Sequence, residues 1–397
     1  MPFRQFVLKV HSRCNLACTY CYVYEGPDQS WRERPARVAE ETVRRTAERI
    51  AQHVTTHGLR SIRVDLHGGE PLLVGPAALI GHARAVRDAV PGGCAVAVSV
   101  QTNGTLLTAD AVRRLGAAGI TVGLSLDGGS ARLNHRRVDH AGRPSWPAVR
   151  RAAGLLAGAP AAYGGILCTI DVATDPAETY RSLIALEPTG LDFLLPYGNW
   201  SDPPPGLGPF AGPVGRAARP VPYGTWLARV FDLWWDTPPD QRLVPVRLFG
   251  EIVALLLGAA SRSETVGLSP LAVVVIDTDG ALQRLDSLKT AYAGAPDLGM
   301  DVFRHDFEDA LGHPHTVAAQ ARGLDTLCGS CRRCPVAGVC GGGRYTDRYL
   351  HGSGFDHPSV YCADLEHLIR HIGERLRETV RGRTARGRGA PDEPVRR

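Results

Sequence analysis

The feature that most constrains this chain is the uneven placement of its ten cysteines. Cys14, Cys18 and Cys21 lie within eight residues, and five more lie between Cys328 and Cys362. A chain of 397 residues, 44% of them hydrophobic, can bury its own core and does not need a dense disulfide framework. The N-terminal residues also lack the apolar run of a secretory signal. We therefore expect metal sites, a reducing compartment and a cytoplasmic location.

Composition argues against a membrane-spanning protein and against a nucleic-acid-binding protein. No run approaches the ~18 apolar residues of a membrane helix. The net charge of +5 comes from 45 basic residues that alternate with Asp and Glu, rather than from a continuous basic surface. Only two of the 45 are lysines, Lys9 and Lys289. We expect no nucleic-acid partner and no membrane partner.

Short β-rich runs alternate with helical patterns over the first two hundred residues. The expected strands are residues 6–11, 61–67, 95–102, 120–127, 165–172 and 193–196. The expected helices are residues 35–57, 108–115, 146–156, 177–186, 223–235 and 246–258. Such alternation predicts an α/β fold with a parallel sheet. Six units favour an open, TIM-like partial (β/α)6 barrel over a closed eight-stranded one.

The rest of the chain divides by composition. Residues 1–200 are the expected barrel, and residues 201–260 combine a Pro/Gly-rich linker or covering loop (200–222) with bridging helices. Residues 261–375 form the expected cysteine-rich domain, which starts with a hairpin that turns at Asp279-Gly280. Residues 376–397 are the expected basic, disordered tail.

The spacing Cys14-x3-Cys18-x2-Cys21 directly follows the first strand. Three thiolates in one loop can converge on a metal centre. A structural zinc ion needs four ligands, and only His11 lies close by in the sequence. Three cysteines suit a 4Fe–4S cluster with one open iron. A zinc knuckle and incidental thiols are the alternatives.

The sequence SRCNLACTYCYVY resembles the signature of radical S-adenosylmethionine (SAM) enzymes, in which SAM chelates the open iron. Three downstream motifs agree with it, and each follows an expected strand, at the rim where barrels assemble active sites. They are Gly68-Gly69-Glu70-Pro71, Thr102-Asn103-Gly104, and Ser125 with Asp127-Gly128. Each motif taken alone is also compatible with an ordinary turn. The resemblance implies a SAM site formed by Tyr20 near the adenine, Gly68, Gly69 and Glu70 at the amino group, Arg137 at the carboxylate, and Thr102, Asn103 and Ser125 along the ribose and methionine.

The later cysteines resemble the SPASM extension of radical SAM peptide maturases. Five thiols are more than one four-coordinate centre needs. The resemblance implies that one auxiliary 4Fe–4S cluster is held by Cys331, Cys334, Cys340 and Cys362, with Cys328 as a surplus thiol that can displace one of them. Leu285 and Arg344 stand where the ligands of an inner auxiliary cluster are expected, which favours one auxiliary cluster over two. A zinc site is the alternative.

Asp286 is the candidate catalytic residue. In sulfatase-maturing relatives an aspartate that follows the Gly-x4-Cys motif acts as a base, and Asp286 holds that position here. A carboxylate near the cofactor can take a proton from a radical intermediate. The alternative is a hairpin residue on the surface. Cys94 and Cys168, between apolar neighbours, are expected to be buried and inert.

Over residues 3–372 the chain resembles the FxsB-type SPASM maturases, through stretches such as VDLHGGEPLL and LCGSCRRCPVAGVCGGGRY. This resemblance implies an enzyme that uses a 5′-deoxyadenosyl radical to join an aromatic ring to the Cβ of a nearby residue in a precursor peptide, as a three-residue cyclophane. A flavodoxin or ferredoxin is the implied electron donor. Thioether formation and sulfatase-type formylglycine formation are the alternatives within the class. A non-catalytic Fe–S or zinc protein is the alternative outside it.

Overall fold

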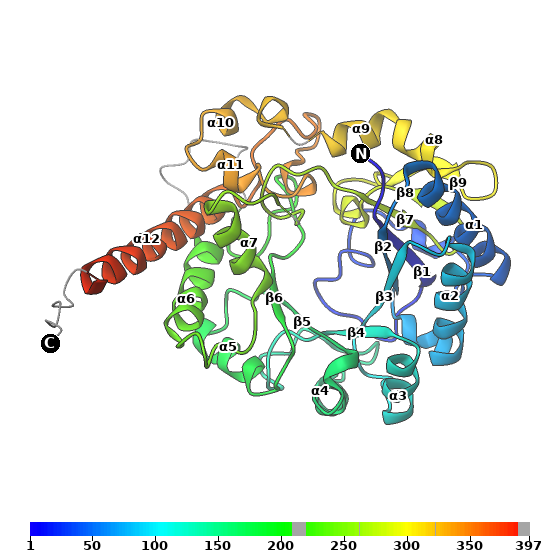
Figure 1. Ribbon diagram of the computed structural model, residues 1–397, viewed down its shortest axis with the longest axis horizontal. Coiled ribbons are helices and arrows are strands. Elements are labelled where there is room, and N and C mark those ends of the chain that lie inside the picture. The colour runs from blue at the N-terminus through cyan, green and yellow to red at the C-terminus, as the bar shows by residue number, and fades with distance from the viewer. Residues whose placement is uncertain (209–219, 262, 322, 388–397) are drawn as a thin grey trace, which may run out of the picture.

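The structure is a computed structural model that describes residues 1–208, 220–261, 263–321 and 323–387 (Figure 1). Its six N-terminal strands run parallel, in the spatial order of a partial barrel. They are β1 (Gln5–His11), β2 (Ser61–Gly68), β3 (Ala95–Thr102), β4 (Ile120–Ser125), β5 (Tyr163–Thr169) and β6 (Leu191–Leu194). Each lies within three residues of its expected bounds, so the predicted barrel is confirmed.

The long helices lie around the outside of this curved row of strands (Figure 1). They are α1 (Glu40–His57), α2 (Gly75–Ala89), α3 (Ala109–Ala117), α4 (Trp146–Ala157), α5 (Pro176–Ile184), α6 (Pro222–Asp236) and α7 (Arg247–Leu256). Thr108 caps α3 by accepting a hydrogen bond from the backbone N–H of Ala111, as its sequence position predicts. Helix α1 starts later than expected because Arg37 pairs with His11 in an extended segment.

Helix α2 was not expected from the sequence. Its apolar stripe is narrow, formed by Leu79, Ala83 and Val86, and Gly75 and Gly81 lower its intrinsic helix propensity. Packing against α1 and α3 stabilises it in the folded protein.

The sheet continues past the boundary expected at residue 261. Strand β7 (Val273–Ile276) pairs in parallel with β1, and β8 (Ala281–Gln283) and β9 (Asp297–Asp301) add antiparallel strands. The expected hairpin is therefore present, and Gly280 supplies the positive φ of +91° that its turn needs. The short helices that follow are α8 (Phe307–Gly312), α9 (Pro314–Gln320), α10 (Gly329–Arg332) and α11 (Ala337–Cys340).

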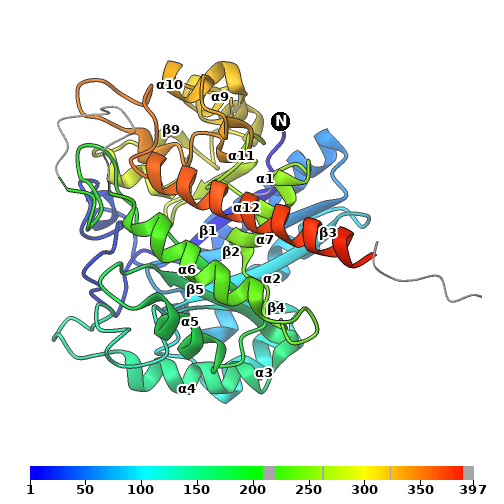
Figure 2. The same cartoon turned by 90° about the vertical axis from the view of Figure 1, so that its left-hand side faces the viewer.

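The expectation of a disordered tail from residue 376 is wrong for its first part, because α12 (Cys362–Gly387) continues to Gly387. Figure 2 shows α12 running alongside α6, where Arg375 Nη2 pairs with Asp236 and His371 Nε2 lies 2.8 Å from Asp232 Oδ1. Within the segment expected to be disordered, Thr379 Oγ1 accepts a hydrogen bond from Trp235 Nε1 of α6 at 3.2 Å. Residues 388–397, and residues 209–219 of the expected covering loop, lie outside the described residues.

One large hydrophobic core joins the sheet to its helices, and it includes Cys168 as predicted, whereas Cys94 is only half-buried. None of the described helices has the length and apolarity needed to cross a membrane. Because the strands are parallel, the carboxyl ends of β1 to β4 meet at one rim of the barrel, where the expected motifs lie.

Candidate active site

The loop that carries Cys14, Cys18 and Cys21 lies against the end of β2. Gly69 N–H donates to the His11 carbonyl at 2.8 Å, and Glu70 N–H donates to the Arg13 carbonyl at 3.0 Å. A Cβ at Gly68 would lie 2.2 Å from the His11 oxygen, and one at Gly69 would lie 2.3 Å from the Arg13 oxygen. The two glycines are therefore required by the close approach of the two backbones, a role beyond the one the sequence implied.

The three thiols fit an iron–sulfur cluster better than a single zinc ion. Around tetrahedral zinc, sulfur atoms lie about 3.8 Å apart. Among the described residues, only one group of three metal-binding atoms lies within 4.8 Å of one another, and it contains no cysteine. The three sulfur atoms are therefore spread more widely than zinc ligands. Burial raises the pKa of Cys14 to about 12 and that of Cys21 to about 11. These thiols are therefore protonated without metal, and metal binding releases their protons.

Glu70 is fully buried at the end of β2, beside the cysteine loop. Its Oε1 accepts hydrogen bonds from Leu72 N–H at 2.9 Å and Thr102 Oγ1 at 2.7 Å, and its Oε2 accepts one from Asn103 N–H at 2.8 Å. Burial raises the pKa of this carboxyl. All three donors are neutral groups, so an ammonium group such as that of SAM suits the site as counter-charge.

Tyr20, Asp127 and Arg137 form a buried network next to Cys18. Arg137 Nη1 lies 2.5 Å from Tyr20 Oη and 3.4 Å from Asp127 Oδ1, and Tyr20 also donates to Asp127. The buried Nε of Arg137 has no hydrogen-bond partner among the described residues. This donor can take a carboxylate, which agrees with the role that the sequence implied.

The other expected SAM contacts lie along the same rim. Asn103 Nδ2 is 3.0 Å from Asn15 Oδ1 and 3.7 Å from Cys14 Sγ, so Asn103 is tied to the cysteine loop. Ser125, at the end of β4, accepts a hydrogen bond from Gln101 Nε2 at 2.8 Å. Thr102 is buried and positions Glu70, which the sequence did not reveal.

A cavity of about 1260 Å³ runs along the inner face of the barrel. Its lining comes from β1, β2, β5, β6, α7 and β7, and includes Tyr22, His67, Tyr197, Asp286 and Arg344. Asp286 begins the short 3-10 helix η5 (Asp286–Thr290) and borders this cavity. The alternative of a surface hairpin residue is wrong, because only 13% of the Asp286 side chain is exposed.

Asp286 is held by a lysine and a tyrosine. Lys9 Nζ lies 2.5 Å from Asp286 Oδ1, and Tyr22 Oη donates to Oδ2 at 3.2 Å. Lys9 also lies 3.5 Å from Asp277. Burial is the largest single effect and raises the pKa of Asp286, but the ammonium groups of Lys9 and Lys289, with the hydrogen bond from Lys9, together outweigh it and hold the pKa below its ordinary value. Asp286 is therefore ionised at neutral pH.

Both lysines of the chain are buried, and sequence reasoning gave neither of them a role. Lys289 Nζ lies 3.0 Å from Asp28 Oδ1, and both side chains are 1% exposed. Lysines are normally exposed. The rarity of lysine, two among 45 basic residues, could have indicated these roles. In an arginine-rich chain, a lysine marks a position that suits a compact ammonium group rather than a guanidinium.

Four of the later cysteines line one small cavity, and the fifth, Cys328, lies beside Cys331. Cys331, Cys334, Cys340 and Cys362 line a single small cavity between α10, α11 and the start of α12, with Glu366 at its edge. Cys328 does not line it, and its Sγ lies 3.3 Å from Ser330 Oγ. The four thiols that the sequence grouped together are thus brought together by the fold.

Leu285 and Arg344 offer no ligand for a second auxiliary cluster. Leu285 is buried among apolar side chains. Arg344 donates to Asp347 Oδ2 at 2.9 Å and to the Leu195 carbonyl at 2.9 Å, and its guanidinium lies 4.4 Å from the centre of the Tyr197 ring. A buried, fully engaged guanidinium occupies that position instead of a thiolate.

The fold and the site together define a partial (β/α) barrel with three thiols after β1 and a buried carboxylate after β2. Residues 8–160 match the model of the radical SAM superfamily, so this part of the chain is a radical SAM domain. Its cofactors are SAM and a 4Fe–4S cluster, and SPASM-type maturases hold auxiliary clusters as well.

Known proteins resemble the chain well beyond this domain. A cysteine-type anaerobic sulfatase-maturating enzyme of Clostridium perfringens is 26% identical over 344 residues, which are 84% of this chain and 90% of that protein. The structure of native anSMEcpe with bound AdoMet has a TM-score of 0.78 at 21% identity, and the match covers 94% of this chain and 99% of that one. The structure of anSMEcpe with AdoMet and the Cp18Cys peptide has a TM-score of 0.76, also at 21% identity, over 96% and 100% of the two chains. These structures share the fold of the present chain.

Proposed function

We propose that this protein is a radical SAM peptide maturase that joins an aromatic ring to the Cβ of a nearby residue of a ribosomally made precursor peptide, forming a three-residue cyclophane. The observation that carries the proposal is the cavity of about 1260 Å³ that reaches Asp286 from the open side of the barrel. Cavities for small ligands are about 300–1,000 Å³, so this one has room for several residues of a peptide.

The relatives support a peptide substrate. One of the structures that share this fold holds a peptide together with AdoMet. The cavity wall offers aromatic surface for a substrate ring, since Tyr22 and Tyr197 pack at an angle of 55° with ring centres 4.4 Å apart. Aromatic pairs at such distances pack favourably with a further ring.

The residues of this chain have distinct tasks in the proposed reaction. Cys14, Cys18 and Cys21 hold the cluster, while Glu70 and Arg137 bind the amino and carboxylate ends of SAM. When bound, cluster and SAM supply a radical that removes one hydrogen atom from the peptide. The barrel wall holds the substrate Cβ and ring together and excludes water, which supplies most of the catalytic advantage.

Forming the new carbon–carbon bond leaves one proton and one electron to be removed. Asp286 is the base that takes the proton from the ring carbon. Its lowered pKa is compatible with this task, because the proton released as a ring regains aromaticity is strongly acidic and a weak base suffices. Cys331, Cys334, Cys340 and Cys362 would hold the auxiliary cluster, which would supply an acceptor for the electron. The overall change is the loss of two hydrogens from the peptide.

Formylglycine formation is the second candidate, and the full-length similarity to the Clostridium perfringens enzyme favours it. In that reaction the oxidised side chain is Cys or Ser, and no ring is involved. The absence of thiols at Leu285 and Arg344 separates this chain from the motif of sulfatase-maturing relatives and favours the crosslink.

The test is anaerobic incubation of the reconstituted enzyme with SAM, a reductant and the peptide encoded beside its gene. We expect 5′-deoxyadenosine and a peptide that has lost two hydrogens, with fragmentation absent between the linked residues. A mass change confined to a Cys or Ser side chain would establish formylglycine formation instead. No 5′-deoxyadenosine would exclude both reactions.

A further inference from the structure

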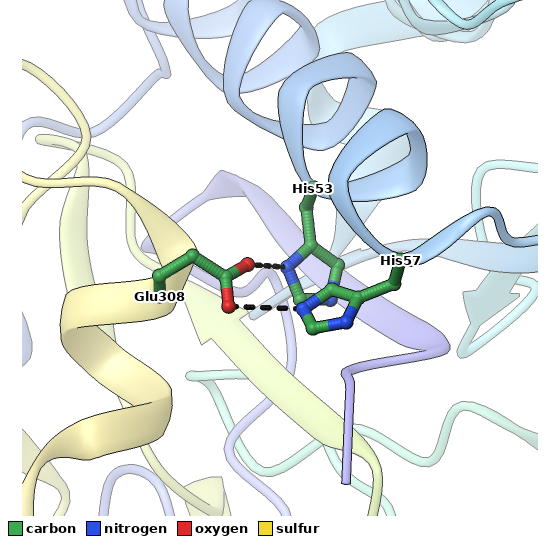
Figure 3. A group of neighbouring side chains, drawn as sticks. All are labelled: His53, His57 and Glu308. Carbon is green, nitrogen blue, oxygen red and sulfur yellow. Dashed lines mark hydrogen bonds and ion pairs between the residues drawn. The ribbon is translucent and has the colours of Figure 1, made fainter.

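A third cluster of metal-binding side chains lies on the outside of the barrel, away from both groups of cysteines. His53 and His57 occupy the last turns of α1, and Glu308 lies near the start of α8 (Figure 3). His53 Nδ1 is 2.6 Å from Glu308 Oε1, and His57 Nε2 is 2.9 Å from Glu308 Oε2. The carboxylate thus faces both imidazoles, as Figure 3 shows.

This arrangement is close to that of a metal site. Histidines at positions i and i+4 lie on one helix face, where both can reach one ion. Zinc binds His nitrogen at about 2.0–2.1 Å and carboxylate oxygen at about 2.0–2.2 Å, which places tetrahedral ligand atoms about 3.3 Å apart. The three ligand atoms already lie within 4.8 Å of one another. An opening of less than about 1 Å between the carboxylate and the rings admits the ion.

The surrounding side chains hold His53 in place and leave His57 and Glu308 accessible to solvent. The His53 side chain is 1% exposed, with the rings of Phe3, Phe6 and Phe307 centred 5.8, 5.9 and 5.9 Å away. His57 is 28% exposed and Glu308 is 38% exposed. An ion can therefore enter from solvent, and its fourth position remains open to water. Two imidazoles and one carboxylate suit zinc and other divalent transition ions rather than Ca²⁺ or Mg²⁺.

We propose that His53, His57 and Glu308 form a zinc site that fastens α8 to α1. Glu308 is separated from His53 by 255 residues, so the ion links the segment after β9 to the first helix of the barrel. That segment leads to the four thiols around α10 and α11. The site thereby stabilises the attachment of the cysteine-rich segment without taking part in the radical reaction.

The experiment titrates the reconstituted, cluster-loaded enzyme with Zn²⁺ under anaerobic conditions and measures binding by calorimetry. We expect one site in the wild type, with only nitrogen and oxygen neighbours in zinc X-ray absorption and with unchanged cluster absorption. Changes beside metal ligands cost about 10–100-fold in affinity, so removal of a ligand in His57→Ala or Glu308→Gln is expected to cost at least about 100-fold. Zinc is also expected to raise the melting temperature of the wild type and of neither variant.

His82→Ala is the matched control, because His82 is a half-buried histidine on the neighbouring helix α2 and is not part of the trio. We expect this variant to bind zinc as the wild type does. The two ligand variants change exposed side chains, and circular dichroism verifies that they fold. Equal zinc affinity in wild type and both variants, sulfur neighbours around the bound zinc, or no zinc binding at all would each overturn the proposal and leave the trio as hydrogen bonds between α1 and α8.

Discussion

Lys9 Nζ and Asp286 Oδ1 lie 2.5 Å apart inside the barrel, although 277 residues separate them in the sequence. The contact joins the first strand to the start of η5, and it connects Asp286, on the wall of the large cavity, to the buried Lys9. Lys9 serves two carboxylates, since Asp277 lies 3.5 Å away on its other side. Lys9 therefore helps to keep Asp286, the proposed base, ionised, and because Lys9 is buried, water cannot take over this role.

Lys9→Met tests this dependence. Without the ammonium group, burial dominates and raises the pKa of Asp286 above its ordinary value. The carboxylate then takes up a proton as pH falls through the raised pKa, and it can no longer act as a base. We expect crosslinked product per 5′-deoxyadenosine to decline towards acidic pH in the variant and to stay level in the wild type. The measurement is a pH series analysed by mass spectrometry.

Asp277→Asn is the control for that series, because it removes the other carboxylate of Lys9 and leaves the Lys9–Asp286 contact in place. Its pH profile is expected to follow the wild type. Breaking a buried ion pair costs about 3–5 kcal/mol, so each variant is first checked for folding by its cluster content. A Lys9→Met profile identical to that of the wild type would show that Lys9 does not control the base.

Asp286→Asn separates hydrogen abstraction from product formation. The change keeps the size of the side chain and removes its basicity. We expect SAM cleavage to persist while crosslinked peptide falls by about 10²–10⁴-fold, the usual cost of losing a general base. Asp279→Asn, at the turn of the neighbouring hairpin, is the control and is expected to have no effect. If Asp286→Asn forms product at the wild-type rate, the base is another residue.

The sequence predicted the barrel because its strands are β-branched runs separated by clear helical patterns. It missed α2, where glycines obscure the periodicity, and the helical continuation of α12, which contacts α6 through the hydrogen bond from Trp235 to Thr379. It placed the three motifs at one rim because parallel strands bring their carboxyl ends together.

The sequence did not reveal what holds these residues in place. Thr102 binding to Glu70, Arg137 to Tyr20 and Lys9 to Asp286 are contacts between distant segments, and no local pattern encodes them. The His53–Glu308 contact is of the same kind. Predicting such pairs requires the register and packing of elements that only the fold defines.

The auxiliary cluster is tested by iron content. If Cys331, Cys334, Cys340 and Cys362 hold one 4Fe–4S cluster, the reconstituted enzyme contains about eight irons. We expect Cys340→Ser to lower this towards about four irons and Cys328→Ser to leave it unchanged, because Cys328 lies outside the cavity that the four thiols line. A content near about twelve irons, or tightly bound zinc in place of the second cluster, would contradict the assignment.

The first cluster is tested by the triple change of Cys14, Cys18 and Cys21 to Ala. The loop is fixed by backbone contacts with β2, so we expect the protein to fold and to keep its auxiliary cluster. It is expected to lose about four irons and all SAM cleavage. The assay is 5′-deoxyadenosine by chromatography, and product above background from the purified variant would refute the assignment.

Glu70→Gln tests whether the buried carboxylate is the counter-charge of SAM. Glutamine keeps one oxygen that can accept from Leu72 and Thr102, but its amide cannot accept the hydrogen bond from Asn103 N–H and carries no charge. A hydrogen bond between charged groups contributes about 1.5–3 kcal/mol, so we expect SAM to bind about 10–100-fold more weakly. Asp65→Asn is the matched control, because Asp65 is a buried carboxylate on β2, the strand that precedes Glu70, and it pairs with Arg63. Equilibrium binding of SAM to the reconstituted enzyme measures the effect, and equal affinities for wild type and Glu70→Gln would mean that the ammonium group of SAM binds elsewhere on the rim.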